Sequence, residues 1–328
     1  MRNFLEQQPQ FDATLDDYEE PRRKPRASGY RRQPYIRETA SVAPKAAVGQ
    51  IDLGRSPEHA KLIQQTDFQI FDLPRPFAMP PGLEVSPFDE YDWETGQQYE
   101  SILEARTPSL ATRGVFPSLK DDRVLQALSM GEFAIQFALM FHPYVVDIRE
   151  QYPYYTDEAY QRALLAGKKM NRSDLLTFDL VLTYWNPMLR ALRYHVVSVK
   201  HVSHVLEKKD RDREIKERTL GSGRDWTWEM LRSNATPMRE LGNYAALWSM
   251  AKSEKVRHLY EPSRRLADGL MTHSVRGSME SVLERRARSM GISTDTSIHL
   301  FVSAVSHGFV PLDHSKRVDA RLPIPLAA

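Results

Sequence analysis

The sequence predicts an α/β protein in which helices flank a mixed sheet. Three observations predict this class: an apolar stretch with helical periodicity over Val124–Phe141, a β-branched run at Val145–Ile148, and two further apolar runs at Leu175–Tyr184 and Arg193–Lys200. The turn-forming pair Asn-Pro at 186–187 separates the last two runs, so we expect them to form a hairpin. A helix followed by paired strands is therefore the expected centre of the fold.

The composition limits the class of protein and its partners. At 328 residues the chain exceeds one average domain, so two domains and a tail are expected. The formal net charge is only +2, so contacts with nucleic acid would have to come from local patches. The chain has no cysteine, which excludes disulfides and thiolate metal sites. No apolar run approaches the roughly 20 residues of a membrane helix, and the first residues lack the core of a signal peptide, so we expect a soluble, cytoplasmic protein.

Residues 1–106 are expected to form a partly disordered N-terminal extension that packs on the next domain or on a partner. The segment Pro21–Arg37 carries seven Lys or Arg and no acid, and its composition fits a DNA-gripping segment and a solvated tail equally. Residues 62–73 are interpreted as a strand or edge element, and the acidic aromatic cluster Phe88–Trp93 as a surface loop in preference to a docking peptide.

Residues 107–250 are expected to form the main globular domain. Its first stretch has Gly and Pro punctuation, which predicts irregular chain with short strands. Nearly every position of a later helix carries a charge, so that helix is expected to be solvated. Beyond the elements above, the expected order is a short helix at Thr156–Lys169, the charged helix at Lys208–Arg218, a strand at Asp225–Leu231 and a helix at Arg239–Ser249.

Residues 251–328 change in texture and are expected to form a small winged-helix-like domain. A domain of this kind binds DNA or protein, and basic residues in it allow the first: Arg285, Arg286, Arg288, Lys316 and Arg317. The expected elements are helices at Lys255–Asp268, Ser278–Ser289 and Thr294–His307 and a short β wing from Gly308–Leu312 and Arg317–Ile324.

Three side chains stand out as candidate catalytic residues: Glu132, Asp179 and Lys200. Glu132 borders the apolar face of its predicted helix, where a lone glutamate usually meets water. Asp179 interrupts a run that would otherwise be a buried strand, and a buried carboxylate needs a donor, a cation or a metal. Lys200 ends the next strand and shares a face with Ser198, although an isolated lysine at a strand end is often simply solvated.

A helix Glu, a strand Asp and a next-strand Lys supply the parts of a metal-dependent nuclease. Hard oxygen ligands hold Mg²⁺, which activates a water, while a lysine orients that water or neutralises charge on the phosphate. A zinc site at His195, His201 and His204 is a weaker alternative, because no acidic partner follows at metalloprotease spacing. Candidate DNA contacts are Arg113, Lys120, Lys168, Lys169 and Arg172.

Longer motifs in the main domain resemble those of the TnsA family, the endonuclease subunits of heteromeric bacterial transposases. The most specific is VVDIREQYP, which follows a helix carrying the family's first catalytic acid. The charged helix and DWTWEML match later family elements, and the likeness continues more loosely over 251–328. The other matching segments are PSLATRGVFPSLKDDRVLQALSMGE, TFDLVL and VSVK, which extend the close likeness over about residues 107–250.

The resemblance implies a restriction-endonuclease-like core that cuts the 5′ strands at transposon ends. It implies Mg²⁺, with Mn²⁺ as a substitute, held by Glu132, Asp179 and the main-chain carbonyl of Val199, with Lys200 as the catalytic lysine. It also implies DNA, a TnsB-type transposase and a TnsC-type AAA+ ATPase regulator as partners. The chain has Ser198 where the family often has Gln, and residues 1–106 exceed what the family core needs.

Two other hypotheses remain open at this point. A non-catalytic subunit that docks DNA or a partner predicts no dependence on Mg²⁺ and normal transposition without Lys200. A stand-alone restriction-type nuclease predicts cleavage of DNA without any partner protein. Retention of all three candidate residues favours the first hypothesis, a nuclease within a transposase.

Overall fold

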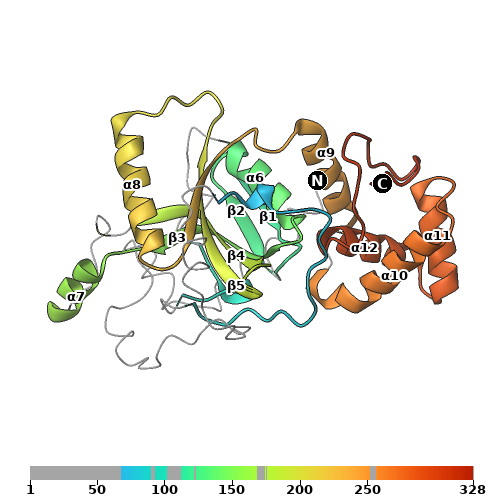
Figure 1. The fold of residues 1–328 in the computed structure, drawn as a ribbon, viewed down its shortest axis with the longest axis horizontal. Helices are drawn as coiled ribbons and strands as arrows, with labels where there is room; N and C mark the ends of the chain where they lie inside the picture. The colour runs from blue at the N-terminus through green and yellow to red at the C-terminus, as the bar shows by residue number, and fades with distance from the viewer. Residues whose placement is uncertain are drawn as a thin grey trace.

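The computed structural model describes a central sheet with helices on both of its faces and a group of helices at one end (Figure 1). The strands lie in the middle of the molecule, helix α8 stands at one end and helices α10, α11 and α12 lie at the other. The residues described are 68–89, 93–101, 112–121, 123–167, 174, 176–251 and 256–327. The predicted basic segment Pro21–Arg37 and the candidate DNA contacts Lys168, Lys169 and Arg172 lie outside the described residues.

The main sheet has four strands in the order β3-β4-β5-β6. The first three pair antiparallel, whereas β5 and β6 are parallel, so the predicted mixed sheet and the predicted hairpin are both present. The parallel pair requires a crossover connection, and α8 supplies it. The bounds are β3 Val145–Tyr154, β4 Leu176–Asn186, β5 Ala191–Lys200, α8 Lys208–Ser222 and β6 Thr227–Arg232.

The predicted helix over Val124–Phe141 is wrong in its first part. Residues Val124–Ala127 form strand β2, which pairs antiparallel with β1 (Gly114–Pro117), and helix α6 spans only Met130–Met140. Ser129 explains the boundary, because its side chain caps the helix by accepting a hydrogen bond from the amide of Glu132. The short strands predicted for the start of the main domain are therefore present. One of them, β2, consists of residues that were predicted to be helical.

The two faces of the sheet have different partners. Helices α6 and α9 (Met238–Ala251) share one face with Leu180, Leu182 and Val197 in the largest apolar core. The opposite face carries an aromatic cluster, which includes Val181 and Val196 of the sheet and is joined by Leu220 of α8. The short helix α7 (Asp157–Leu165) follows β3 and contributes Tyr160 to the aromatic cluster.

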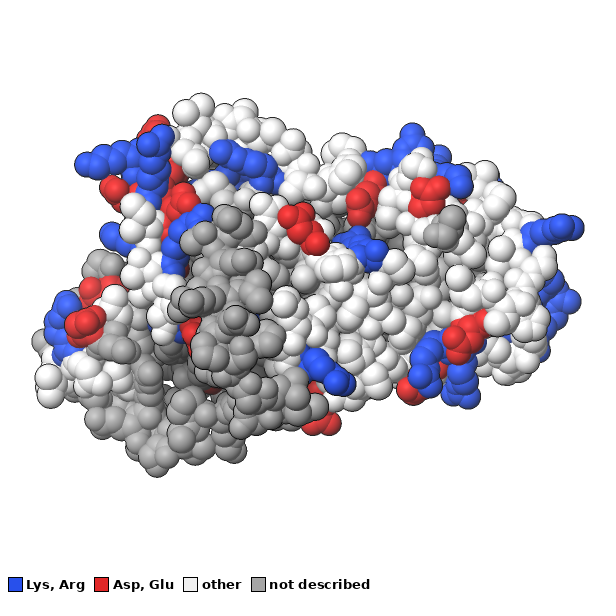
Figure 2. All heavy atoms as spheres, in the orientation of Figure 1, with Lys and Arg blue, Asp and Glu red and all other residues white. Residues whose placement is uncertain are grey.

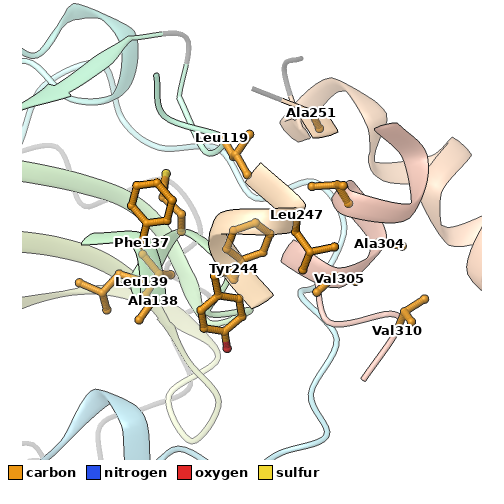
Figure 3. Close-up of a cluster of buried hydrophobic side chains, with 14 of the residues drawn as sticks. Leu119, Phe137, Ala138, Leu139, Tyr244, Leu247, Ala251, Ala304, Val305 and Val310 are labelled. Atoms are coloured by element: carbon orange, nitrogen blue, oxygen red, sulfur yellow. The ribbon is translucent and has the colours of Figure 1, made fainter. Parts of the chain in front are cut away.

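The C-terminal helices share the core of the main domain. Leu119, Phe137 and Tyr244 of the main domain and Ala304 and Val305 of the C-terminal part lie in one buried cluster (Figure 3). The predicted β wing is not present: over Gly308–Leu312 and Arg317–Ile324 the described chain is irregular and makes one isolated bridge, Leu312↔Leu326. The helices are η4 Val256–Leu259, α10 Tyr260–Thr272, α11 Met279–Met290 and α12 Thr294–Ser306, close to the predicted ranges.

The described part of the N-terminal extension packs on both halves of the molecule, as expected. The residues predicted as a strand or edge instead include the 3₁₀ turn Ile70–Asp72, where the Ile70 amide donates to Glu229 on β6. Further along, the Met79 amide donates to the carbonyl of His307, at the end of α12. Gly308 permits this path, because a Cβ there would lie 1.9 Å from the Phe77 carbonyl oxygen.

The surface loop predicted for the acidic aromatic cluster is found at Phe88, which is 47% exposed, but the prediction is wrong at Asp89 and Trp93. Trp93 is 1% exposed and Asp89 is 6% exposed, and both pack against strand β3 through Tyr152. Burial of the aromatic ring is favourable, and the cost of burying the carboxylate is offset by its partners Tyr152 and Arg149. The extension is therefore part of the folded unit. No described helix is long and apolar enough to cross a membrane.

Candidate functional site

The side-chain alternation of β3 and β4 reverses where the candidate site lies. Along β3, Ile148 belongs to the large core but Tyr152 belongs to the aromatic cluster on the opposite face, although a period of two would place both on one face. Gln151 lies between them with φ of 49°, a left-handed conformation that non-glycine residues seldom adopt. On β4 the same reversal separates Leu180 from Phe178, and Asp179 lies at it.

The pairing register places these two reversals side by side. Glu150 pairs with Leu180 and Tyr152 pairs with Phe178, so Gln151 lies across from Asp179. The reversals turn both polar side chains away from the two apolar layers. Uncommon backbone conformations of this kind gather at functional sites, where surrounding structure holds them in place.

Glu132 lies in the first turn of α6 and points to this position. Its Oε2 accepts from the Leu128 amide at 3.0 Å and from Gln151 Nε2 at 3.3 Å, and its Oε1 accepts from the Ser129 hydroxyl at 3.3 Å. All three donors are neutral. Burial, opposed by the Leu128 hydrogen bond and reinforced by the charge of Asp179, raises the pKa of Glu132 to about 7. Gln151, which donates to Glu132, lies across the sheet from Asp179, so the two carboxylates flank Gln151.

A glycine lets α6 reach the sheet at this point. A Cβ on Gly131 would lie 3.0 Å from the Cβ of Ser233 and 3.6 Å from a methyl of Val199. The absence of a side chain thus allows the first turn of α6 to rest on the ends of β5 and β6. Glu132 follows Gly131 in sequence, so the close approach brings its carboxylate to the end of the β4–β5 hairpin.

Asp179 is held by β5 and by helix α8. Its Oδ2 accepts from the Val199 amide at 2.8 Å and from the Ser198 hydroxyl at 3.4 Å. Its Oδ1 accepts from Arg213 Nη2 at 3.2 Å. The Asp179 side chain is 15% exposed, so the carboxylate can still be reached from solvent. The hydrogen bond from Ser198 shows that this residue contacts the candidate site, where the resembling family often has Gln.

Lys200 lies on the same strand but its ammonium is held elsewhere. Its Nζ lies 3.4 Å from Asp210 Oδ1 on α8, and Asp210 Oδ2 also contacts His204 Nε2 at 3.0 Å. Asp210 and Arg213 are three residues apart on one helix, about 4.5 Å along its axis. Lys200 and Asp179 therefore contact neighbouring positions of α8. The structure brings together Glu132 and Asp179, with Lys200 beside them in a separate ion pair.

The predicted solvated character of the helix Lys208–Arg218 is wrong for one of its sides. Asp210 and Glu217 are buried, and Arg213 between them contacts Asp179. The other sides of α8 carry exposed acids and bases that mix both signs, at the upper left of Figure 2. The inward side chains follow helical spacing, but nearly every position of this helix is charged, so the stripe does not stand out in the sequence.

Another predicted site residue, Lys120, has its partners elsewhere. Lys120 is 5% exposed, and its Nζ donates to the carbonyl oxygens of Ser306 at 3.0 Å and His142 at 3.4 Å, so its predicted contact with DNA phosphate is wrong. Arg113 is half-buried just before β1. The long apolar side chain of Lys120 ends in a strong hydrogen-bond donor, and Lys120 thereby joins the end of α12 to the main domain.

The three histidines of the alternative zinc site have separate partners. His195 is buried, with its ring nitrogens 2.7 Å from Thr227 Oγ1 and 2.8 Å from Glu229 Oε1. His201 contacts Ser203, and His204 contacts Asp210. Within the described ranges, no three histidines or carboxylates lie together as a metal-binding group. Glu132 and Asp179 are hard oxygen donors that lie on either side of Gln151.

Comparison with known proteins assigns no family to the chain. No protein-family model matches it. No curated protein matches it.

Proposed function

We propose that the chain is a Mg²⁺-dependent DNA endonuclease subunit of a heteromeric transposase, which cleaves the 5′ strands at transposon ends. The observation that carries this proposal is the placement of Glu132 and Asp179 around Gln151, which donates to Glu132 and lies across the sheet from Asp179. Lys200 follows Val199, whose amide donates to Asp179. The fold class, with a mixed sheet between helices, is compatible with a restriction-endonuclease-like core. The resemblance of VVDIREQYP and TFDLVL to the TnsA family supplies the transposase context.

The donors at the site fit a hard divalent cation. The two carboxylates offer anionic oxygens, and the raised pKa of Glu132 indicates a negative charge that its neutral donors do not balance. Glu132 and Asp179 would hold Mg²⁺ or Mn²⁺ together with the Val199 carbonyl and water. When bound, such an ion lowers the pKa of an attacking water and stabilises the leaving oxygen of the phosphodiester.

The residues of the chain position these groups and then act on the phosphate. Gln151 orients Glu132, and the Val199 amide with Ser198 orients Asp179. Lys200 reaches a phosphate only after it leaves Asp210, and its ammonium then neutralises charge on the oxygens of the phosphate. The proposed partners are transposon-end DNA, a TnsB-type transposase that cuts and joins the 3′ ends, and a TnsC-type ATPase.

The test is cleavage of transposon-end DNA by the full chain together with its partner transposase. We expect Asp179→Ala to reduce 5′-strand nicking at least about 1,000-fold, because the loss of one ligand removes several kcal/mol of charge stabilisation. Asp212→Ala, which removes an exposed acid of α8, is the matched control and should nick normally. Circular dichroism checks that both variants are folded. Normal nicking by the folded Asp179→Ala protein would refute the site.

A non-catalytic docking subunit is the second candidate, and one observation favours it. The ammonium of Lys200 pairs with Asp210, which leaves the lysine outside the carboxylate pair. This candidate predicts that Lys200→Ala supports normal transposition and that Mg²⁺ has no effect on strand cleavage. The endonuclease proposal predicts the opposite for both measurements.

A further inference from the structure

Helix α8 carries an inward stripe that holds both strand-borne residues of the candidate site. Asp210 pairs with Lys200, Arg213 pairs with Asp179, and Glu217 is 3% exposed beneath Arg213. Their spacing of three and four residues places them on one side of the helix. The two strand-borne residues, Lys200 and Asp179, are thus each paired with a side chain of opposite charge from a single helix.

Arg213 is fixed at its inner end by Glu217 and is partly exposed to solvent at its outer end. Its Nε donates to Glu217 Oε1 at 2.6 Å, and Glu217 Oε2 in turn accepts from Trp228 Nε1 at 2.9 Å. Its Nη2 donates to the Thr177 carbonyl at 3.0 Å and to Asp179 Oδ1 at 3.2 Å. The Arg213 side chain is 44% exposed, so its guanidinium can turn away from Asp179 without unpacking the core.

The two oxygens of Asp179 have different neighbours. Oδ2 is committed to the Val199 amide, a neutral donor that fixes the carboxylate. Oδ1 faces the guanidinium of Arg213 at 3.2 Å. A divalent ion on this carboxylate would lie within a few ångströms of a fixed positive charge. Like charges at such a distance repel, so the ion and the guanidinium compete for Asp179.

We propose that Arg213 is a positioning residue that holds Asp179 Oδ1 until a divalent cation displaces it. This proposal rests on the proposed function, because it assumes that Asp179 is a cation ligand. It assigns α8 a regulatory role: movement of this helix, or of Arg213 alone, opens Asp179 to the ion. Movement of the whole helix also frees Lys200 from Asp210, so that the two groups then become available together.

The experiment measures Mn²⁺ binding to the full chain by isothermal titration calorimetry, without DNA. We expect Arg213→Gln to bind Mn²⁺ about fivefold more tightly than the wild type, the amount that a partly exposed ion pair is worth. Arg213→Lys keeps the charge and should retain wild-type affinity. Arg211→Gln, on an exposed side of the same helix, is the matched control and should leave the affinity unchanged.

Thermal unfolding gives a second readout, in which the rise in melting temperature on addition of Mn²⁺ reports binding to the folded protein. Arg213→Gln should melt lower than the wild type without metal, yet gain more from added Mn²⁺. Equal or weaker Mn²⁺ binding by Arg213→Gln overturns the positioning role. If that result is found while Asp179→Asn still abolishes Mn²⁺ binding, the proposed cation site stands and only the role of Arg213 falls. If wild type and Asp179→Asn bind Mn²⁺ alike, both proposals fall.

Discussion

Three consecutive residues of β3, Arg149, Glu150 and Gln151, belong to hydrogen-bonded groups that each contain one carboxylate, and the three carboxylates differ in what balances their charge. Arg149 pairs with Asp89 at 2.5 Å, and Glu150 receives both terminal nitrogens of Arg123 at 2.7 and 3.0 Å. Gln151 instead offers Glu132 a neutral amide. The first two carboxylates have a guanidinium each and are structural. The third has only neutral hydrogen-bond donors, and that difference sets Glu132 apart from the two structural carboxylates.

The largest expected effect on stability comes from removing Arg149, the cation of the buried Arg149–Asp89 ion pair. Arg149→Met should lower the free energy of unfolding by about 4 kcal/mol, because Asp89 and Asp147 stay buried without their cation. Urea unfolding followed by circular dichroism measures it. Arg211→Met, an exposed arginine, should change stability by less than about 0.5 kcal/mol.

A double variant sharpens this prediction. Asp89→Asn added to Arg149→Met removes one of the uncompensated charges, so it should recover part of the lost stability. A loss of under about 1 kcal/mol for Arg149→Met alone would contradict the view that this pair is structural. It would also remove the contrast with Glu132.

The unbalanced carboxylate predicts a dependence of stability on pH. The folded-state pKa of Glu132 is about 7 against an ordinary value of 4.5, so the folded protein binds this proton more tightly than the unfolded chain. The resulting stabilisation is fully present below about pH 4.5 and is lost as the pH rises through about 7. It amounts to on the order of 3 kcal/mol.

Glu132→Gln should remove this part of the pH dependence. We expect its free energy of unfolding to fall less than that of the wild type between pH 5 and pH 8, in urea unfolding with EDTA present. Glu280→Gln, at an exposed position of α11, is the control and should keep the wild-type slope. Addition of Mn²⁺ above pH 7 should restore stability to the wild type and not to Glu132→Gln. Identical slopes for the wild type and Glu132→Gln would contradict the raised pKa.

The same contrast explains which parts of the molecule were predictable. The strands β4 and β5, the turn between them and helices α11 and α12 follow from apolar periodicity and turn residues, which are local signals. The bulk of VVDIREQYP lies in β3, and every residue of that strand is buried. The motif most specific to the resembling family therefore serves mainly the fold, and of the three residues compared here only Gln151 contacts the candidate site.

What could not be predicted depends on contacts between distant segments. The left-handed conformation of Gln151 has no sequence signal, since glutamine does not favour positive φ. Arg213 and Asp210 were hidden in a helix where charge is everywhere, and only the tertiary fold selects the side that faces Asp179. The strand Val124–Ala127 was predicted as helix from its apolar spacing. Its pairing with β1 decides the conformation of so short a segment, and that pairing has no local signal.

The smallest expected effect on stability concerns the buried ammonium of Lys120, which donates hydrogen bonds to main-chain carbonyl groups. Lys120 donates to the carbonyls of His142 and Ser306, and Ser306 is the last residue of α12, where the helix dipole favours a cation. Lys120→Met keeps the apolar stem but leaves both carbonyls without this donor, so we expect a loss of about 1–2 kcal/mol in urea unfolding. Affinity for a DNA duplex, and its dependence on salt, should not change. A weaker affinity with a shallower salt dependence would instead return Lys120 to the phosphate-contacting residues, because each lost phosphate contact reduces that slope by about one.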